Sequence, residues 1–127
     1  MPFDRAPGMK DYPALIRDIS ANLMPLRKDQ PDALQGFAAL AQGATRTGTL
    51  DRKTKELIAL AIGVVTHCDG CIGFHIEALV KLDASLAEVE EALAMAVYMG
   101  GGPALMHAAD AMAAFRQFQE KMQKVSA

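Results

Sequence analysis

Residues 57–65, LIALAIGVV, limit the possible folds most, because this run contains no charged or polar side chain. A helix that is apolar on every side is normally buried on every side, so we expect a central helix enclosed by others. Hydrophobic residues make up 51% of the chain and Trp is absent, so Ala, Leu and Met must supply the packing. Strand-like alternation is nearly missing. The 127 residues therefore predict one all-α domain over 1–127, a compact bundle of about six helices.

Start and stop signals divide the chain into six expected helices. Asp51 is a suitable N-cap, SLAE at 85–88 reads as a capping box, and GGGP at 100–103 separates the last two helices. Pro25 and Gly43 are plausible stops for the first two. The expected helices cover residues 13–24, 31–43, 51–66, 69–82, 85–100 and 103–124.

The charge pattern argues against two classes of partner. The net charge is −2, and the short basic cluster at residues 46–55 is typical of a solvated helix start, so nucleic acid is not expected. Residues 92–109 carry no formal charge, but GGGP interrupts them, so we expect no membrane span. The N-terminus lacks the apolar run of a signal peptide, and we expect a cytoplasmic protein. Because several helices are apolar on most faces, we also expect a homo-oligomer.

The sequence HCDGCIGFH at residues 67–75 holds both cysteines of the chain. In a reducing compartment such a pair is more often catalytic or metal-binding than a permanent structural disulfide. Cys71 falls in the first turn of an expected helix, where free amides and the helix dipole favour a thiolate. Cys68 is close enough to form a disulfide with Cys71. The pair can therefore supply an attacking and a resolving thiol.

His75 and Glu56 are the candidates for proton transfer. His75 follows Cys71 by four residues, so both lie on one helix face and His75 can relay a proton; the plainer interpretation is a hydrogen-bonded core histidine. Glu56 is either an exposed charge near a helix start or a buried relay carboxylate. If the next helix folds back antiparallel, it brings His75 toward Glu56. We expect a bridging water between them rather than direct contact.

Other interpretations of the cluster stay open. On the helix that contains Glu56, His67 would share a face with that residue and could tune the site, but we favour a residue that caps the helix end or faces solvent. His107 is expected to be partly buried with one hydrogen bond. A thioredoxin-type oxidoreductase would need strands around the motif. A zinc site is a further alternative, although the second Cys or His pair of a structural site is missing. Its ligands would be Cys68, Cys71 and His75, with Glu56, His67 or His107 as the fourth.

One arrangement of residues resembles a known family. Glu56, eleven residues, Cys68, two residues, Cys71, three residues and His75 form a pattern similar to the carboxymuconolactone decarboxylase superfamily, in its alkylhydroperoxidase-D-like branch. The stretches LDRKTKELIALAIG and AVYMGGGPALMHAADAMAAF also resemble that family, and the resemblance covers residues 30 to 120. It implies an all-helical fold and a homotrimer or a homohexamer built from trimers.

The resemblance also implies a peroxidase-like thiol cycle. Cys71 would attack a small hydroperoxide and become the sulfenic acid. Cys68 would donate a proton, resolve the sulfenic acid and exchange with an external dithiol, lipoyl or thioredoxin-like. His75 and Glu56 would form the proton relay, and no organic cofactor or metal is implied.

The sequence departs from that family at one position. Well-characterised peroxidase members carry a second histidine directly before the second cysteine, where this chain has Gly70. The proton relay would be weaker without it, and the natural substrate need not be an alkyl hydroperoxide. The alternatives are a lactone decarboxylase of aromatic catabolism, which has no need of a disulfide, and a non-catalytic redox or zinc-binding module.

Overall fold

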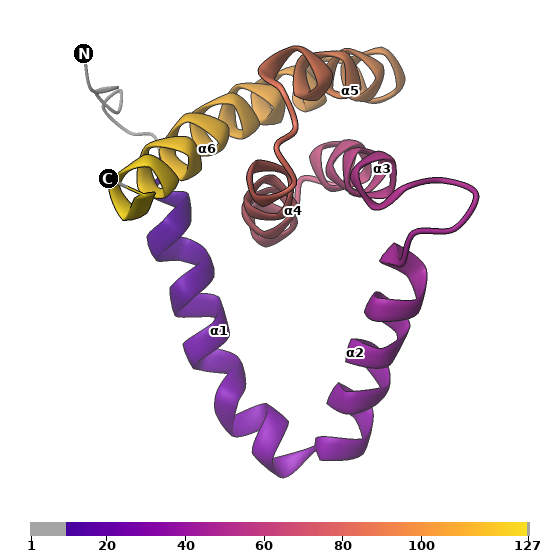
Figure 1. Cartoon of the computed structure of the whole chain (residues 1–127), viewed down its shortest axis with the longest axis vertical. Helices are drawn as coiled ribbons and strands as arrows, with labels where there is room; N and C mark the ends of the chain where they lie inside the picture. The colour runs from indigo at the N-terminus through magenta and orange to yellow at the C-terminus, as the bar shows by residue number, and fades with distance from the viewer. Residues whose placement is uncertain (1–9, 127) are drawn as a thin grey trace.

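The computed structural model describes residues 10–126, and these form six helices (Figure 1). No strand occurs within this range, so the all-α prediction is confirmed. The helices are α1 (Tyr12–Asp29), α2 (Pro31–Thr45), α3 (Arg52–Val65), α4 (Asp69–Lys81), α5 (Leu86–Gly100) and α6 (Gly102–Ser126). Two predicted N-caps are confirmed: Asp51 caps α3, and Ser85 caps α5 with a complete capping box.

Helix α3 lies at the centre of the packed part of the molecule, against α4, α5 and α6. Leu60 and Val64 on this helix are fully buried. The expectation that α3 is buried on every side is wrong for one face, where Ile58 and Ile62 remain exposed, Ile62 by 57%. Those side chains point away from the core that α4 and α6 provide, so apolar composition did not translate into burial within this chain.

Two predicted helix ends are wrong. Helix α1 continues through Pro25 to Asp29, and α2 continues through Gly43 to Thr45. Proline removes one backbone hydrogen bond, but this part of α1 is exposed, so water can satisfy the freed carbonyl group. In α2 the Thr45 hydroxyl donates to the Ala41 carbonyl oxygen at 2.8 Å and closes the last turn.

The second half of α1 and all of α2 form an arm that stands away from the other four helices (Figure 1). The first half of α1 is anchored, because Tyr12 and Ile16 are buried and Ile16 packs closely against Gly73 of α4. In contrast, α2 has no buried residue at all. The arm is therefore held to the rest of the molecule mainly at its two ends.

The last two helices join at a sharp break. Gly101 has a φ of 74°, a backbone conformation that glycine adopts at little cost. The predicted break at the glycine run is thus confirmed. Within residues 10–126, none of the helices combines the length and the apolar character needed to cross a membrane.

Candidate active site

The turn between α3 and α4 carries both cysteines. His67 adopts a left-handed conformation with φ 58°, which reverses the chain after α3 and places Cys68 at the N-cap of α4. The two helices approach closely at this point: a Cβ atom added to Gly63 would lie 2.9 Å from Cys71 Cβ. Glycine at position 63 is what lets α4 pack this tightly beside α3.

Cys68 and Cys71 are joined by a disulfide, with their Cα atoms 5.2 Å apart. The backbone amide of Cys71 donates to Cys68 Sγ at 3.1 Å. Amide donors at a helix N-terminus stabilise negative charge on a capping atom, so the same contact favours a thiolate on Cys68 once the bond is reduced. Both cysteines are partly exposed. A partly exposed Cys-x-x-Cys pair at a helix N-terminus has the chemistry for thiol–disulfide exchange.

Glu56 and His75 are in direct contact across α3 and α4. His75 Nδ1 lies 2.7 Å from Glu56 Oε1, so the expectation of a bridging water is wrong. The close packing that Gly63 permits explains the shorter distance. Glu56 is only 4% exposed, which selects the buried interpretation of this carboxylate over the exposed one. With Nδ1 held by Glu56, the other ring nitrogen of His75 is free to exchange a proton with a neighbouring group.

A second polar cluster, which sequence reasoning missed, lies on the other side of the same turn. The rings of His67 and His107 stack at a centroid distance of 4.7 Å. Asp69, which lies between the cysteines in sequence, accepts hydrogen bonds from Lys10 and from the Tyr12 hydroxyl. Asp110 lies beside His107, with 3.5 Å between its Oδ2 and His107 Nδ1. The i, i+3 spacing of His107 and Asp110 was the one sequence signal for this cluster.

The two histidines of this cluster match the expectations only in part. His67 lies beyond the end of α3, so it does not share a helix face with Glu56; it is exposed, as one of the two favoured interpretations had it. His107 is partly buried as expected, but its Nδ1 makes no hydrogen bond among the described residues, where one was expected.

Burial and neighbouring charges shift the pKa values of groups in this second cluster. Burial, together with the charges of Asp110 and Asp69, raises the pKa of Tyr12 well above its usual value. Burial also tends to raise the pKa of Asp69, but the hydrogen bond and charge of Lys10 outweigh it, and the net shift is downward. The cluster therefore holds two carboxylates next to the cysteine turn, one of which is paired with the Lys10 ammonium group.

The zinc site considered from the sequence is not assembled in this oxidised form, because the two sulfur atoms are bonded to each other. Among the described residues, the group whose ligand atoms come close enough for a metal ion is a different one, made of Asp69, His107 and Asp110.

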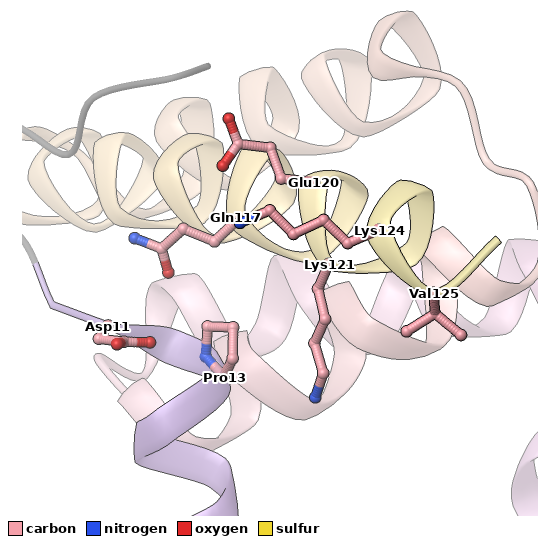
Figure 2. Close-up of a pocket in the computed structure, with 7 residues that line it drawn as sticks. All are labelled: Asp11, Pro13, Gln117, Glu120, Lys121, Lys124 and Val125. Carbon is pink, nitrogen blue, oxygen red and sulfur yellow. The ribbon is translucent and has the colours of Figure 1, made fainter. Parts of the chain in front are cut away.

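A hollow of about 500 Å³ lies away from the cysteines, between the start of α1 and the end of α6. Figure 2 shows its lining residues, with Gln117 extending from α6 toward Asp11 at the start of α1. The Gln117 side chain joins these helices by accepting from the Tyr12 amide and donating to the Lys10 carbonyl oxygen. Neither cysteine lines this hollow, and neither do Glu56 and His75, so it is not the reaction site.

The fold and the site together define a class of protein: a helical protein with a Cys-x-x-Cys disulfide at a helix N-terminus, beside a buried Glu–His pair. Comparison with known proteins gives the family. Residues 31–114 match the model of the carboxymuconolactone decarboxylase family, and the chain belongs to that family.

Two solved structures agree with this assignment, and one sequence relative matches most of the chain. A carboxymuconolactone decarboxylase family protein from Legionella pneumophila is 53% identical, with a TM-score of 0.84 over 85% of this chain and 96% of that chain. A family member from Thermotoga maritima, described as possibly involved in antioxidative response, is 34% identical, with a TM-score of 0.68 over 72% of this chain and 95% of that one. An uncharacterized protein of Cupriavidus necator is 35% identical, covering 83% of this chain and 93% of its own.

Proposed function

We propose that this protein is a thiol-dependent peroxidase that cycles Cys68 and Cys71 between dithiol and disulfide. The observation that carries the proposal is the direct Glu56–His75 contact of 2.7 Å, one helical turn from Cys71. A buried carboxylate that orients an imidazole beside a reactive group is a typical arrangement for proton transfer. A structural disulfide would need no such pair beside it.

The oxidative half of the proposed cycle begins at Cys71. His75 accepts the thiol proton, and the Cys71 thiolate attacks the outer oxygen of the hydroperoxide. The O–O bond breaks, Cys71 becomes a sulfenic acid, and the leaving alkoxide takes a proton from His75 and departs as the alcohol. The Cys68 thiol then attacks the sulfenic sulfur, which releases water and forms the disulfide. Glu56 holds the imidazole in position and stabilises its protonated form.

The reductive half uses an external dithiol of the lipoyl or thioredoxin-like type. One thiolate of the reductant attacks Cys68 Sγ and displaces the Cys71 thiolate. The second thiol of the reductant then attacks the reductant sulfur that is bonded to Cys68 in the mixed disulfide. This step displaces the Cys68 thiolate and leaves the reductant as a disulfide. The amide of Cys71, which donates to Cys68 Sγ in the disulfide, would stabilise this leaving thiolate. A cycle of this kind requires a reducing compartment, so we place the protein in the cytoplasm.

The comparisons support an antioxidant role in general terms. The Thermotoga maritima relative is described as possibly involved in antioxidative response. Gly70 stands where well-characterised peroxidase members of the family carry a second histidine. We therefore propose that the Glu56–His75 pair is the main proton relay in this chain. The proposed substrates are small organic hydroperoxides, as the family resemblance implies, although Gly70 does not by itself favour them.

The test follows the free thiols of reduced protein after one equivalent of an organic hydroperoxide. Wild type should lose both thiols and gain the intramolecular disulfide by mass. Cys68→Ser should accumulate a sulfenic acid on Cys71 that dimedone traps, and Cys71→Ser should keep its single thiol. Wild-type thiols that persist for hours would refute peroxidase chemistry, and rapid oxidation in Cys71→Ser would instead make Cys68 the attacking residue.

The reductant is tested separately, with oxidised protein and either dihydrolipoamide or reduced thioredoxin. Recovery of both thiols with only one of them would identify the class of dithiol that the site accepts. Failure of both dithiols to restore the thiols would contradict the reductive half of the cycle. The result of the peroxide experiment would not be affected, because the oxidative half is tested separately.

We also propose that several copies of the chain assemble, as a trimer or hexamer. Phe37 and Leu40 on α2 are each about two-thirds exposed, 69% and 66%, and α2 has no buried residue in this chain. A second exposed apolar surface lies on α3 and α5, in a hollow lined by Ala61, Ile62, Val65, Met95, Ala96 and Met99. Two such surfaces on one small chain are more than a soluble monomer normally leaves uncovered.

Light scattering after gel filtration tests this assembly. Wild type should elute as three or six chains, and Phe37→Glu should shift the population toward monomer. Val125→Glu is the matched control, because Val125 is exposed on α6, away from both surfaces. A monomeric wild type would refute the assembly.

A further inference from the structure

The polar cluster beside the cysteine turn contains a set of ligands for a metal ion. Asp69, His107 and Asp110 each place one ligand atom within 4.8 Å of the other two. Asp69 comes from the first turn of α4, while His107 and Asp110 lie three residues apart on α6, which puts them on one helix face. The three groups thus converge from two helices that pack against each other. One imidazole and two carboxylates suit a divalent first-row transition ion.

The hydrogen bonding of His107 is a second observation at this site. Its Nδ1 atom is buried and has no hydrogen-bond partner among residues 10–126, although Asp110 Oδ2 lies only 3.5 Å away. Buried polar atoms in native proteins are almost always partnered. The stacked ring of His67 restricts rotation of the His107 side chain. A buried ring nitrogen that makes no hydrogen bond and lies 3.5 Å from a carboxylate oxygen of the cluster is well suited to coordinate an ion.

The surroundings of Asp69 resemble the outer support of a metal site. The Tyr12 hydroxyl donates to Asp69 Oδ1 at 3.2 Å, and Tyr12 is fully buried. Groups that hold a ligand from behind in this way commonly orient it for coordination. The other oxygen, Oδ2, accepts from the ammonium group of Lys10. A cation is thus already drawn to this point of the cluster.

We propose that Asp69, His107 and Asp110 bind one divalent transition ion per chain, such as Zn²⁺, and that this ion competes with the Lys10 ammonium for Asp69. The proposal stands apart from the peroxidase cycle. The ligands do not include either cysteine, and the site exists while the cysteines are oxidised. Lys10 makes the proposal specific, because removal of a competing positive charge should strengthen binding of the ion.

The experiment titrates fully oxidised protein with Zn²⁺ by calorimetry, and with Co²⁺ by visible absorption, in a buffer that does not chelate metals. A thiol count of zero beforehand ensures that Cys68 and Cys71 cannot bind the metal. One ion per chain is expected. His107→Gln and Asp110→Asn should each weaken binding at least tenfold, and Lys10→Met should tighten it several-fold.

Asp18→Asn is the matched control, since it removes an exposed carboxylate of α1 and should leave the affinity unchanged. Circular dichroism checks that every variant is folded, and Asp110→Asn carries the test if His107→Gln does not fold. Absence of saturable binding would overturn the proposal. So would binding that survives both ligand substitutions, which would mean an adventitious ion only, or binding that weakens in Lys10→Met.

Discussion

Replacement of Glu56 by Gln separates the chemical role of this residue from its role in packing. The two side chains have nearly the same shape, and the Gln carbonyl oxygen can still accept a hydrogen bond from His75 Nδ1 at the 2.7 Å contact. The negative charge that stabilises a protonated imidazole is lost, however. Charge-assisted hydrogen bonds are roughly twice as strong as neutral ones, so the free energy of unfolding should fall by only about 1 kcal/mol.

The effect on the reaction should be far larger. A positioned acid–base pair contributes a factor of roughly 10² to 10⁴ in rate, so peroxide-dependent loss of thiols in Glu56→Gln should slow by about 10²-fold or more. Stopped-flow measurement of thiol oxidation gives the rate, and urea titration gives the stability. Glu91→Gln, which changes an exposed carboxylate on α5, should leave both unchanged. Oxidation of Glu56→Gln at the wild-type rate would refute the assignment of Glu56 to the relay.

Three further predictions concern the framework of the site. Gly63→Val should lower the free energy of unfolding by about 1–3 kcal/mol in urea titration, because even the first added carbon would lie 2.9 Å from Cys71 Cβ. The downward shift in the pKa of Asp69 means that its contribution to stability is present above its usual pKa and is lost as the pH falls through the folded-state value. Thermal unfolding should therefore show a difference between wild type and Asp69→Asn at neutral pH that shrinks as the pH falls below the usual pKa of an aspartate. A difference that grows with acid would contradict the pairing with Lys10. Ser85→Ala should lower the free energy of unfolding by about 0.5–2 kcal/mol in the same urea titration. Ser85→Asp can still cap α5, so its free energy of unfolding should stay close to that of wild type.

Local signals were sufficient to predict most of the helices, and distances between helices were not predictable in the same way. The capping residues Asp51 and Ser85 fixed where α3 and α5 begin, because the cap is a contact within a few residues of sequence. The direct Glu56–His75 contact depends on how closely α3 and α4 pack. Gly63 was the residue in the apolar run that could have indicated it, since only a missing side chain lets the helices approach so far.

Two other differences have different physical causes. An apolar sequence indicates that a helix surface is buried, but it does not indicate whether the same chain or another chain buries it. Ile62 was therefore expected in the core, and it is exposed in the single chain. The cluster of Asp69, His107 and Asp110 is assembled from α4 and α6, and nothing in the local sequence around Asp69 indicates which later residues will meet it.

Helix α1 has two halves with different surroundings, and amide hydrogen exchange should report them separately. Amides near Tyr12 and Ile16 lie under α4 and should open only when much of the bundle unfolds. Amides in the exposed second half should exchange through local fraying in an isolated chain. If copies cover the arm, those same amides should become slow to exchange at high protein concentration and fast on dilution. Exchange rates in the first half of α1 would then measure the stability of the fold, and exchange rates in the second half would measure association between chains.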